Sequence, residues 1–338
     1  MWDSLANLGD GGIILQELLI KALYFFFLSI AAGVSAAAQH PGGATSFRES
    51  LNNAWWTGPL YAISPETLSR GHYLIEPYVF SVFSNGARQH VSSNYIYYGL
   101  KDNLSLGVIP VLGSTSASET QAGSGWQMGD FTALAMLRIT EFNEHTHVPT
   151  IALEIQETFP TGRYDQLGNQ ASNGLSNGSY TTTLQGNAQY YTWLPNGRIL
   201  RTRLNLLGTI SNSVPVNGKS VFSTPEGFRG TAVPGSTFTE NIAWEYSITR
   251  HWVAALDVIS QAKNTTRISG RLISANQQES TPPKSQLSSA ASLGFQLAPA
   301  MEYNLTPNLG IIAGVSITVS GRNTSAAIAP MIAVNWYK

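Results

Sequence analysis

The sequence predicts an all-β protein, a twelve-stranded antiparallel transmembrane β-barrel that follows an N-terminal signal peptide. Three observations support this prediction. Residues that favour strands and turns dominate the composition, side-chain polarity alternates with a period of two along most of the chain, and short turns alternate with long loops.

The composition also excludes several classes of protein. The chain has 338 residues, of which 43% are hydrophobic and 12% charged, with 31 Gly, 14 Tyr and 8 Trp. A net charge of −1 without a basic run is not the electrostatic footprint of a nucleic-acid-binding protein. Because the chain contains no cysteine, it has neither disulfides nor thiolate metal sites, and we expect no cofactor.

The first 38 residues have the pattern of a secretory signal peptide. An apolar stretch, 22–34, follows Lys21 and leads into Ala36-Ala37-Ala38. This stretch is shorter than the roughly 18 residues of a spanning helix, and small residues at positions −3 and −1 suit cleavage after Ala38. We therefore assign residues 1–38 to a signal peptide in preference to an uncleaved membrane anchor.

Residues 39–70 show no alternation of polarity. They are rich in Pro, Gly and Ser and contain the pair Trp55-Trp56, so they do not predict a strand. The sequence leaves open whether they form a periplasmic lead-in or a plug segment. The barrel itself is predicted to cover residues 71–338.

Twelve segments beyond Gly71 alternate in polarity and are predicted to be strands. They cover residues 71–83, 91–100, 104–112, 126–139, 148–159, 180–193, 199–210, 237–248, 251–262, 286–304, 308–319 and 324–337. An even number of strands places both termini on the same side of the membrane.

The connections between these strands alternate in length. Short turns are predicted at 101–103, 143–147, 195–198, 249–250 and 306–308. Longer segments rich in Gly, Ser, Asn and Pro lie at 84–90, 113–125, 160–179, 211–236, 263–285 and 320–323. Since outer-membrane barrels have short periplasmic turns and long outer loops, the sequence predicts an outer-membrane location with both termini in the periplasm.

One face of each predicted strand is polar and suits a lumen. In 199–210, for example, Leu204 and Leu206 oppose Arg201 and Arg203. Charged residues on such faces are predicted to line the lumen: Glu76, Asp130, Arg138, Glu154, Arg201, Arg203, Glu245, Asp257 and Glu302. They either orient a polar solute or pair with one another to rigidify the barrel, and we give the pairing the greater weight.

Aromatic residues are predicted to form the girdles at the membrane interfaces. These residues are Tyr95, Tyr97, Tyr98, Tyr190, Tyr191, Trp193, Trp252, Tyr303, Trp336 and Tyr337. The final strand, which ends Trp336-Tyr337-Lys338, looks like the aromatic C-terminal signal read by the outer-membrane assembly machinery. We therefore expect outer-membrane lipids and this machinery as partners.

Several motifs resemble the meta-pathway phenol-degradation family of transporter-like outer-membrane barrels. They are Trp56-Thr57-Gly58-Pro59-Leu60, Gly71-His72-Tyr73 with Glu76-Pro77-Tyr78, Gln156-Glu157-Thr158-Phe159-Pro160-Thr161-Gly162-Arg163-Tyr164-Asp165, and Trp193-Leu194-Pro195-Asn196-Gly197-Arg198. The resemblance covers most of the mature chain and implies an outer-membrane barrel that transports hydrophobic compounds. It does not identify a solute.

The loop that opens at Pro160 is a candidate constriction. If it folds into the barrel mouth, Thr161, Arg163, Tyr164 and Asp165 would narrow the lumen, and otherwise it is an exposed loop. No metal is predicted, because neither this loop nor the pair His145 and His147 has a complete set of ligands.

One pattern suits an enzyme. Residues two apart on a strand share a face, so the His90 imidazole could reach the Ser92 hydroxyl, with Asn94 next on that face. A twelve-stranded outer-membrane phospholipase uses a His-x-Ser pair, but the rest of its local pattern is absent here. We therefore expect no enzymatic activity.

The sequence predicts a passive outer-membrane channel or transporter for small hydrophobic or aromatic compounds, which leave through the lumen or through a lateral exit. One alternative is a structural or surface-interaction barrel with a plugged lumen. A phospholipase-like hydrolase is the less favoured third hypothesis.

Overall fold

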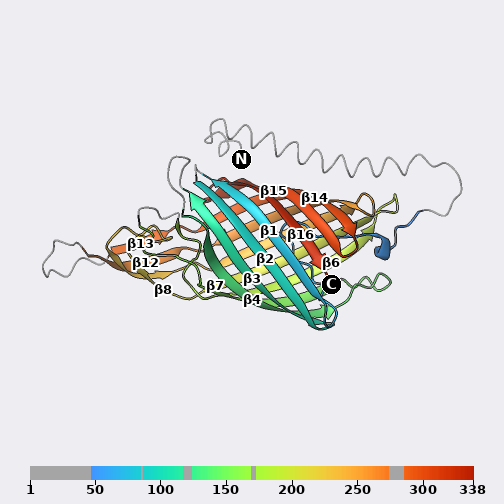
Figure 1. Ribbon diagram of the computed structural model, residues 1–338, viewed down its shortest axis with the longest axis horizontal. Helices are drawn as coiled ribbons and strands as arrows, with labels where there is room; N and C mark the ends of the chain where they lie inside the picture. Colours follow the sequence, from blue (N-terminus) through green and yellow to red (C-terminus); the bar gives the residue numbers. More distant parts are fainter. Residues whose placement is uncertain (1–46, 85–86, 117–123, 169–172, 274–284) are drawn as a thin grey trace, which may run out of the picture.

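A closed antiparallel β-barrel forms the body of the protein (Figure 1). This computed structural model describes residues 47–84, 87–116, 124–168, 173–273 and 285–338. The predicted signal peptide, 1–38, lies outside the described residues. Within the described ranges, no helix has the length and apolar character needed to cross a membrane.

Twelve strands close the barrel, as predicted. They are β1 (Tyr73–Ser84), β2 (Ala87–Lys101), β3 (Leu104–Ser116), β4 (Gln127–Thr140), β5 (Thr150–Phe159), β6 (Thr181–Trp193), β7 (Ile199–Ser211), β10 (Thr237–Ser247), β11 (Trp252–Lys263), β14 (Ser292–Thr306), β15 (Leu309–Arg322) and β16 (Ile328–Tyr337). Each strand pairs with the barrel strands that come before and after it in the chain, and β1 pairs with β16 to complete the ring. Closure satisfies the backbone groups that an open edge would expose to hydrocarbon.

Four further strands form a second sheet beyond one end of the barrel, on the left in Figure 1. They are β8 (Val214–Asn217), β9 (Phe228–Val233), β12 (Thr266–Leu272) and β13 (Ser285–Ser289), in the order β13-β12-β9-β8. The prediction of loops at 211–236 and 263–285 is therefore wrong. These segments form a sheet because they bury their own small core, which includes Val216, Phe228 and Ile268.

Two predicted strand boundaries are also wrong. The strand expected at 286–304 is divided, since its first residues belong to β13 and the barrel strand β14 begins at Ser292. Alternation continues across this break, so periodicity alone does not reveal it. The long loop expected at 84–90 is a hairpin instead, because β1 and β2 pair as far as Ser84 and Ala87.

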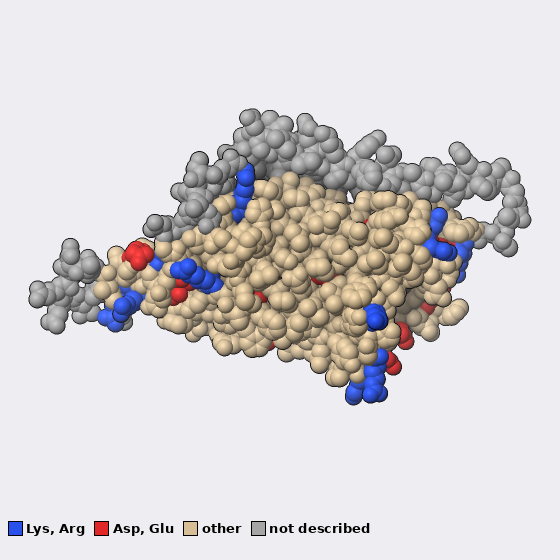
Figure 2. All heavy atoms as spheres, viewed as in Figure 1, with Lys and Arg blue, Asp and Glu red and all other residues tan. Residues whose placement is uncertain are grey.

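The outer surface of the barrel is apolar over its middle. Side chains such as Leu153, Ile155 and Leu184 point outward and are exposed. In Figure 2 most charged side chains on the visible face lie toward the two ends, and few lie on the wall between them. An apolar band between charged ends is the surface that a barrel presents to a lipid bilayer.

The described start of the chain and the C-terminus lie toward the same end of the barrel, opposite the second sheet (Figure 1). At this end the backbone of Glu49 donates to the Gly197 carbonyl in a predicted short turn, at 2.9 Å. Lys338 and Tyr73 exchange backbone hydrogen bonds of 2.9 and 2.7 Å. The periplasmic position of this end stays a prediction.

A charged side chain is costly on a surface that faces lipid and is tolerated on one that faces water, so substitution by Arg distinguishes the two surfaces. We expect Ile242→Arg, at the middle of β10 on the outer face, to lower the free energy of unfolding by about 2–4 kcal/mol. Leu287→Arg in the second sheet is the matched control, because the two side chains are 40% and 42% exposed. Denaturant unfolding in lipid vesicles measures both, and equal losses would contradict the position of the membrane band.

Candidate functional site: the internal segment and its cavity

The segment 49–70 runs through the interior of the barrel rather than along its wall. Inward-facing carboxylates take the place of strand partners for its backbone. Glu302 accepts a hydrogen bond from the N–H of Thr57 at 2.7 Å. Asp257 accepts from the N–H groups of Leu60 and Ala62 at 3.0 and 2.9 Å. Hydrogen bonds to charged acceptors are stronger than neutral ones, so these contacts fix the path of the segment.

Amide and guanidinium side chains hold the same stretch through its carbonyls. Asn205 accepts from the N–H of Ile63 at 2.9 Å and donates to the carbonyl of the same residue at 3.0 Å. Arg203 donates to the carbonyl of Ala62 at 2.7 Å. The barrel wall therefore satisfies buried backbone groups that have no partner in secondary structure.

A buried ion cluster stands beside these contacts. Arg201 binds Glu245 through two nitrogens, one of them 2.7 Å from Oε2, and Arg203 lies 3.2 Å from the same oxygen. The Arg201 guanidinium also lies over the Trp56 ring, 4.5 Å from its centroid. Charges of both signs thus neutralise one another on the inner wall and bind the internal segment.

Both ends of the segment are held by carboxylates of its own. Glu49 pairs with Arg198 at 2.9 Å. Glu66 accepts hydrogen bonds from Gln189 at 2.7 Å and from Tyr191 at 2.9 Å. Contacts therefore run along the segment from one end to the other.

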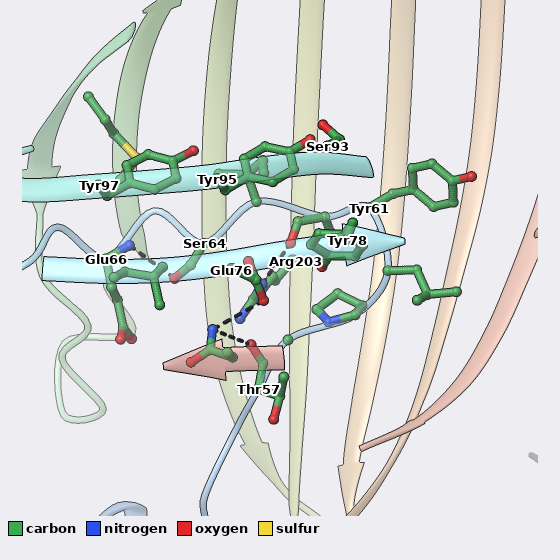
Figure 3. A pocket seen from close by; sticks show the side chains of 18 of the residues that line it. Thr57, Tyr61, Ser64, Glu66, Glu76, Tyr78, Ser93, Tyr95, Tyr97 and Arg203 are labelled. Atoms are coloured by element: carbon green, nitrogen blue, oxygen red, sulfur yellow. Dashed lines mark hydrogen bonds between the residues drawn. The ribbon is translucent and has the colours of Figure 1, made fainter. Parts of the chain in front are cut away.

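A cavity of about 300 Å³ lies between the internal segment and the opposite part of the wall. Strands β1 to β4 and β16 contribute to it together with Arg203 of β7, and Figure 3 shows Arg203 with residues from the segment and from β1 and β2 around it. Its lining is mostly apolar and aromatic, with Leu74, Tyr78, Tyr95, Tyr97 and Met331. Polar groups such as Glu76 and Ser93 interrupt this lining.

The aromatic part of the lining consists of Tyr61, Tyr78, Tyr95, Tyr97 and Phe80, and three of the tyrosines contact one another. The rings of Tyr95 and Tyr97 are parallel, with centroids 6.5 Å apart, and Tyr78 meets Tyr95 edge-on at 5.6 Å. The Tyr97 hydroxyl is buried and makes no hydrogen bond within the described chain. A hydroxyl in this state is available to a bound molecule.

The expected girdle position is wrong for some aromatic residues. Tyr95 and Tyr97 line the cavity, and Tyr191 is buried against the internal segment. Aromatic rings suit both an interior and a membrane interface, so residue type alone does not identify the face. Tyr98, Trp252 and Trp336 do point outward and are exposed.

The other predicted lumen residues lie on inward faces, but they do not form one cluster. Glu76 borders the cavity and accepts from Asn335 at 3.1 Å. Glu154 is buried and accepts from Gln156 at 2.6 Å. Their role in the passage of a solute stays a prediction.

Asp130 and Arg138 lie at opposite ends of β4. Asp130 accepts from the backbone N–H groups of Gly162 and Asn177, at 3.2 and 3.3 Å, and so binds the loop after β5. Arg138 pairs with Glu141 at 2.6 Å at the end that holds the termini. Neither residue contacts the internal segment through a hydrogen bond.

The candidate constriction residues divide between two surroundings. Thr161 donates to the Gly129 carbonyl at 2.9 Å on the barrel rim. Tyr164 donates to a β8 carbonyl at 3.1 Å, and Asp165 accepts from a β8 N–H at 2.9 Å. Arg163 donates to a carbonyl of its own loop. Tyr164 and Asp165 therefore bind the second sheet, and a constriction stays a prediction.

The candidate catalytic pair is not assembled. His90 Nδ1 lies 2.7 Å from Ser81 Oγ, and the Ser92 hydroxyl donates to Asn94 at 3.2 Å. His147 lies 3.0 Å from the Tyr190 hydroxyl. Among the residues that the structure describes, no three His, Cys, Asp or Glu side chains are placed to hold a metal ion.

Sequence reasoning did not identify the residues that bind the segment's backbone through amides. Asn205, Asn304 and Asn335 each donate to a carbonyl of residues 55–63. Their one signal in the sequence is a position on the polar face of a strand. A prediction based on charged residues does not include these asparagines, although an amide side chain offers both a donor and an acceptor.

A closed barrel with an apolar outer band and a polar inner face defines an outer-membrane β-barrel. The chain belongs to the family described as "Putative MetA-pathway of phenol degradation", whose model matches residues 68–329. This finding confirms the resemblance inferred from the sequence.

A solved outer-membrane channel has the same fold, and a porin is a more distant match. The COG4313 outer membrane channel from Pseudomonas putida F1 is 14% identical, with a TM-score of 0.57 over 81% of this chain and 97% of that one. The NanC porin is 9% identical, with a TM-score of 0.43 over 78% and 98%. The search of curated proteins found no match.

Hydrogen exchange can measure how strongly Asp257 binds the backbone of the segment. In Asp257→Asn one acceptor oxygen becomes a donor, so the N–H groups of Leu60 and Ala62 no longer both have a partner. We expect amide hydrogen exchange over residues 60–62 to accelerate by about tenfold or more. Glu154→Gln is the control, since Glu154 is a buried inward carboxylate bound to Gln156. Equal exchange in both variants would contradict this role of Asp257.

Proposed function

We propose that the protein is a passive outer-membrane channel for small hydrophobic or aromatic compounds. The observation that carries this proposal is the cavity, since it lies inside a membrane barrel and has an aromatic lining. Ligand sites of small molecules are concave and mostly apolar, with a few placed polar groups. The family description, which refers to phenol degradation, is consistent with an aromatic solute.

The internal segment acts as the plug of this channel. Its contacts with Glu302, Asp257 and Asn205 fill one side of the lumen and leave the cavity on the other. A solute that crosses along the barrel axis must pass this segment, so its displacement sets the rate of passage. We further propose that the end that holds both termini faces the periplasm and that the second sheet faces outward.

A barrel that is permanently plugged is the alternative function. The contacts at Glu49 and Glu66, at the two ends of the segment, favour it, because they hold the segment along its length. The two hypotheses differ in whether any solute crosses, which the next two predictions measure.

Filling the cavity should block the solute and leave the barrel intact. Ser93 lines the cavity, whereas Ser92 lies on the opposite face of the same strand. We expect Ser93→Phe to slow the uptake of radiolabelled naphthalene by intact cells, because the ring occupies the cavity. Ser92→Phe is the matched control and should leave uptake unchanged. Equal uptake in the two variants would exclude the cavity from the route, and no uptake by the wild type would favour the plugged barrel.

The inner arginines should control conductance. In the double variant Arg201→Ala and Arg203→Ala, the segment loses its contacts at Trp56 and Ala62. We expect a larger conductance in planar bilayers. We also expect the ion selectivity to shift toward cations, because the inner carboxylates remain after the two guanidinium groups are removed. Arg138→Ala, at the far end of β4, is the control. Unchanged conductance and ion selectivity would contradict the lining role of the two arginines.

A further inference from the structure

Strand pairing is continuous within the β1–β2 hairpin but interrupted between this hairpin and its neighbours, β16 and β3. Its two strands pair without a break from Tyr73 and Tyr98 to Ser84 and Ala87. On the β16 side the pairing omits Glu76 and Pro77, between Ile75 and Tyr78, and again Ser81 and Val82, between Phe80 and Phe83. One seam of this hairpin is therefore interrupted within the barrel wall.

The seam on the other side of the hairpin is interrupted at the same level. Between β2 and β3 the pairing passes from Ser93 to Ile96 and omits Asn94 and Tyr95. Asn94 is also the residue that pairs with Pro77 across the hairpin. Both gaps therefore flank one row of residues across the wall.

Proline explains these gaps. Pro77 lies beside the β1–β16 gap, and the register of β2 and β3 places Pro110 opposite Asn94. Proline has no N–H to give to a ladder and is normally excluded from central strands. Side chains partly bridge the gaps, since Asn94 donates to the Pro110 carbonyl at 3.3 Å.

The cavity lies directly behind this part of the wall. Glu76 and Tyr95, the inward-facing residues of the two gaps, both line it. Tyr78 of β1 and Met331 of β16 line it as well, so the cavity borders both sides of the β1–β16 seam. On the outer side of this seam Val79 is exposed on the lipid-facing surface.

Most of the wall that binds the internal segment has no such gaps, except that the pairing of β14 with β15 passes from Leu297 to Ala300 and omits Ala298 and Pro299. Pairing is continuous between β5 and β6, between β6 and β7, between β7 and β10, and between β10 and β11. The seams on both sides of the β1–β2 hairpin are therefore interrupted next to the cavity, whereas the interrupted β14–β15 seam contributes no residue to its lining. Opening a seam in hydrocarbon leaves each separated backbone group without a partner, so a seam that already lacks pairs opens at a lower cost than a continuous one.

We propose that the β1–β16 seam beside Pro77 is a lateral portal between the cavity and the hydrocarbon of the membrane. Its solutes are compounds that partition into hydrocarbon, which reach or leave the cavity without crossing the polar lumen. This inference rests on the proposed channel function and gives that function a route.

A disulfide across the seam tests the portal, because the chain has no cysteine of its own. Val79 and Ile332 are paired on the outer face next to the gap, so we choose Val79→Cys with Ile332→Cys. The control is Ala188→Cys with Leu204→Cys, a paired outer-face position on the continuous β6–β7 seam. The readouts are uptake of radiolabelled naphthalene by intact cells and liposome swelling with arabinose.

We expect the oxidised disulfide at the β1–β16 seam to slow naphthalene uptake by about fivefold or more, with recovery on reduction. The control disulfide should change uptake little, and neither disulfide should change arabinose swelling. A similar effect of both disulfides on naphthalene, or no effect of either, would overturn the portal while the lumen route stands. Absence of naphthalene uptake in the wild type would instead overturn the channel function itself.

A second variant tests the cause of the gap. Pro77→Val restores a backbone N–H at the seam without a cross-link. We expect it to slow naphthalene uptake, whereas Pro299→Val on β14 should not, because Pro299 is absent from the cavity lining. Faster or unchanged uptake in Pro77→Val would contradict the portal.

Discussion

The structure depends on the hydrogen bonds that the barrel wall makes with a chain segment that contains one short 3-10 helix, Leu51–Asn53, and no strand. Backbone N–H groups enclosed in a barrel must find acceptors, and the inner wall supplies them as carboxylates, chiefly Asp257 and Glu302. The same carboxylates would be unstable on that wall without donors. Wall and segment thus satisfy each other, which explains why strongly polar residues are tolerated at the centre of a membrane barrel.

This mutual requirement divides the barrel into two halves. Strands β6 to β14 carry most of the polar residues that hold the segment, with Asn335 of β16 as an exception, whereas β16 and β1 to β4 carry the tyrosines and aliphatic residues around the cavity. The segment therefore serves as an inner partition, with a polar side and an apolar side. The sequence pattern of polar inward faces does not reveal this division, because both halves alternate in the same way.

Much of the barrel could be predicted from the sequence, because period-two alternation and turn residues are local signals. The sheet beyond the barrel could not, since short strands such as β8 depend on contacts among three distant loops. Arg201, Arg203 and Glu245 were expected inside, but the contact of Arg201 with Trp56 depends on the path of the segment. Tyr95 was assigned to the interface because no local feature distinguishes an aromatic ring that faces a cavity.

The β1–β16 seam joins the two ends of the barrel sequence, and this has a consequence for biogenesis. Contacts between residues far apart in the chain form late, so this seam closes after the other strands have paired. The internal segment precedes β1 and binds β7, β10, β11 and β14, all of which are synthesised after it. The segment must therefore settle against the nascent wall before the ring is completed. Barrel closure then traps it in place.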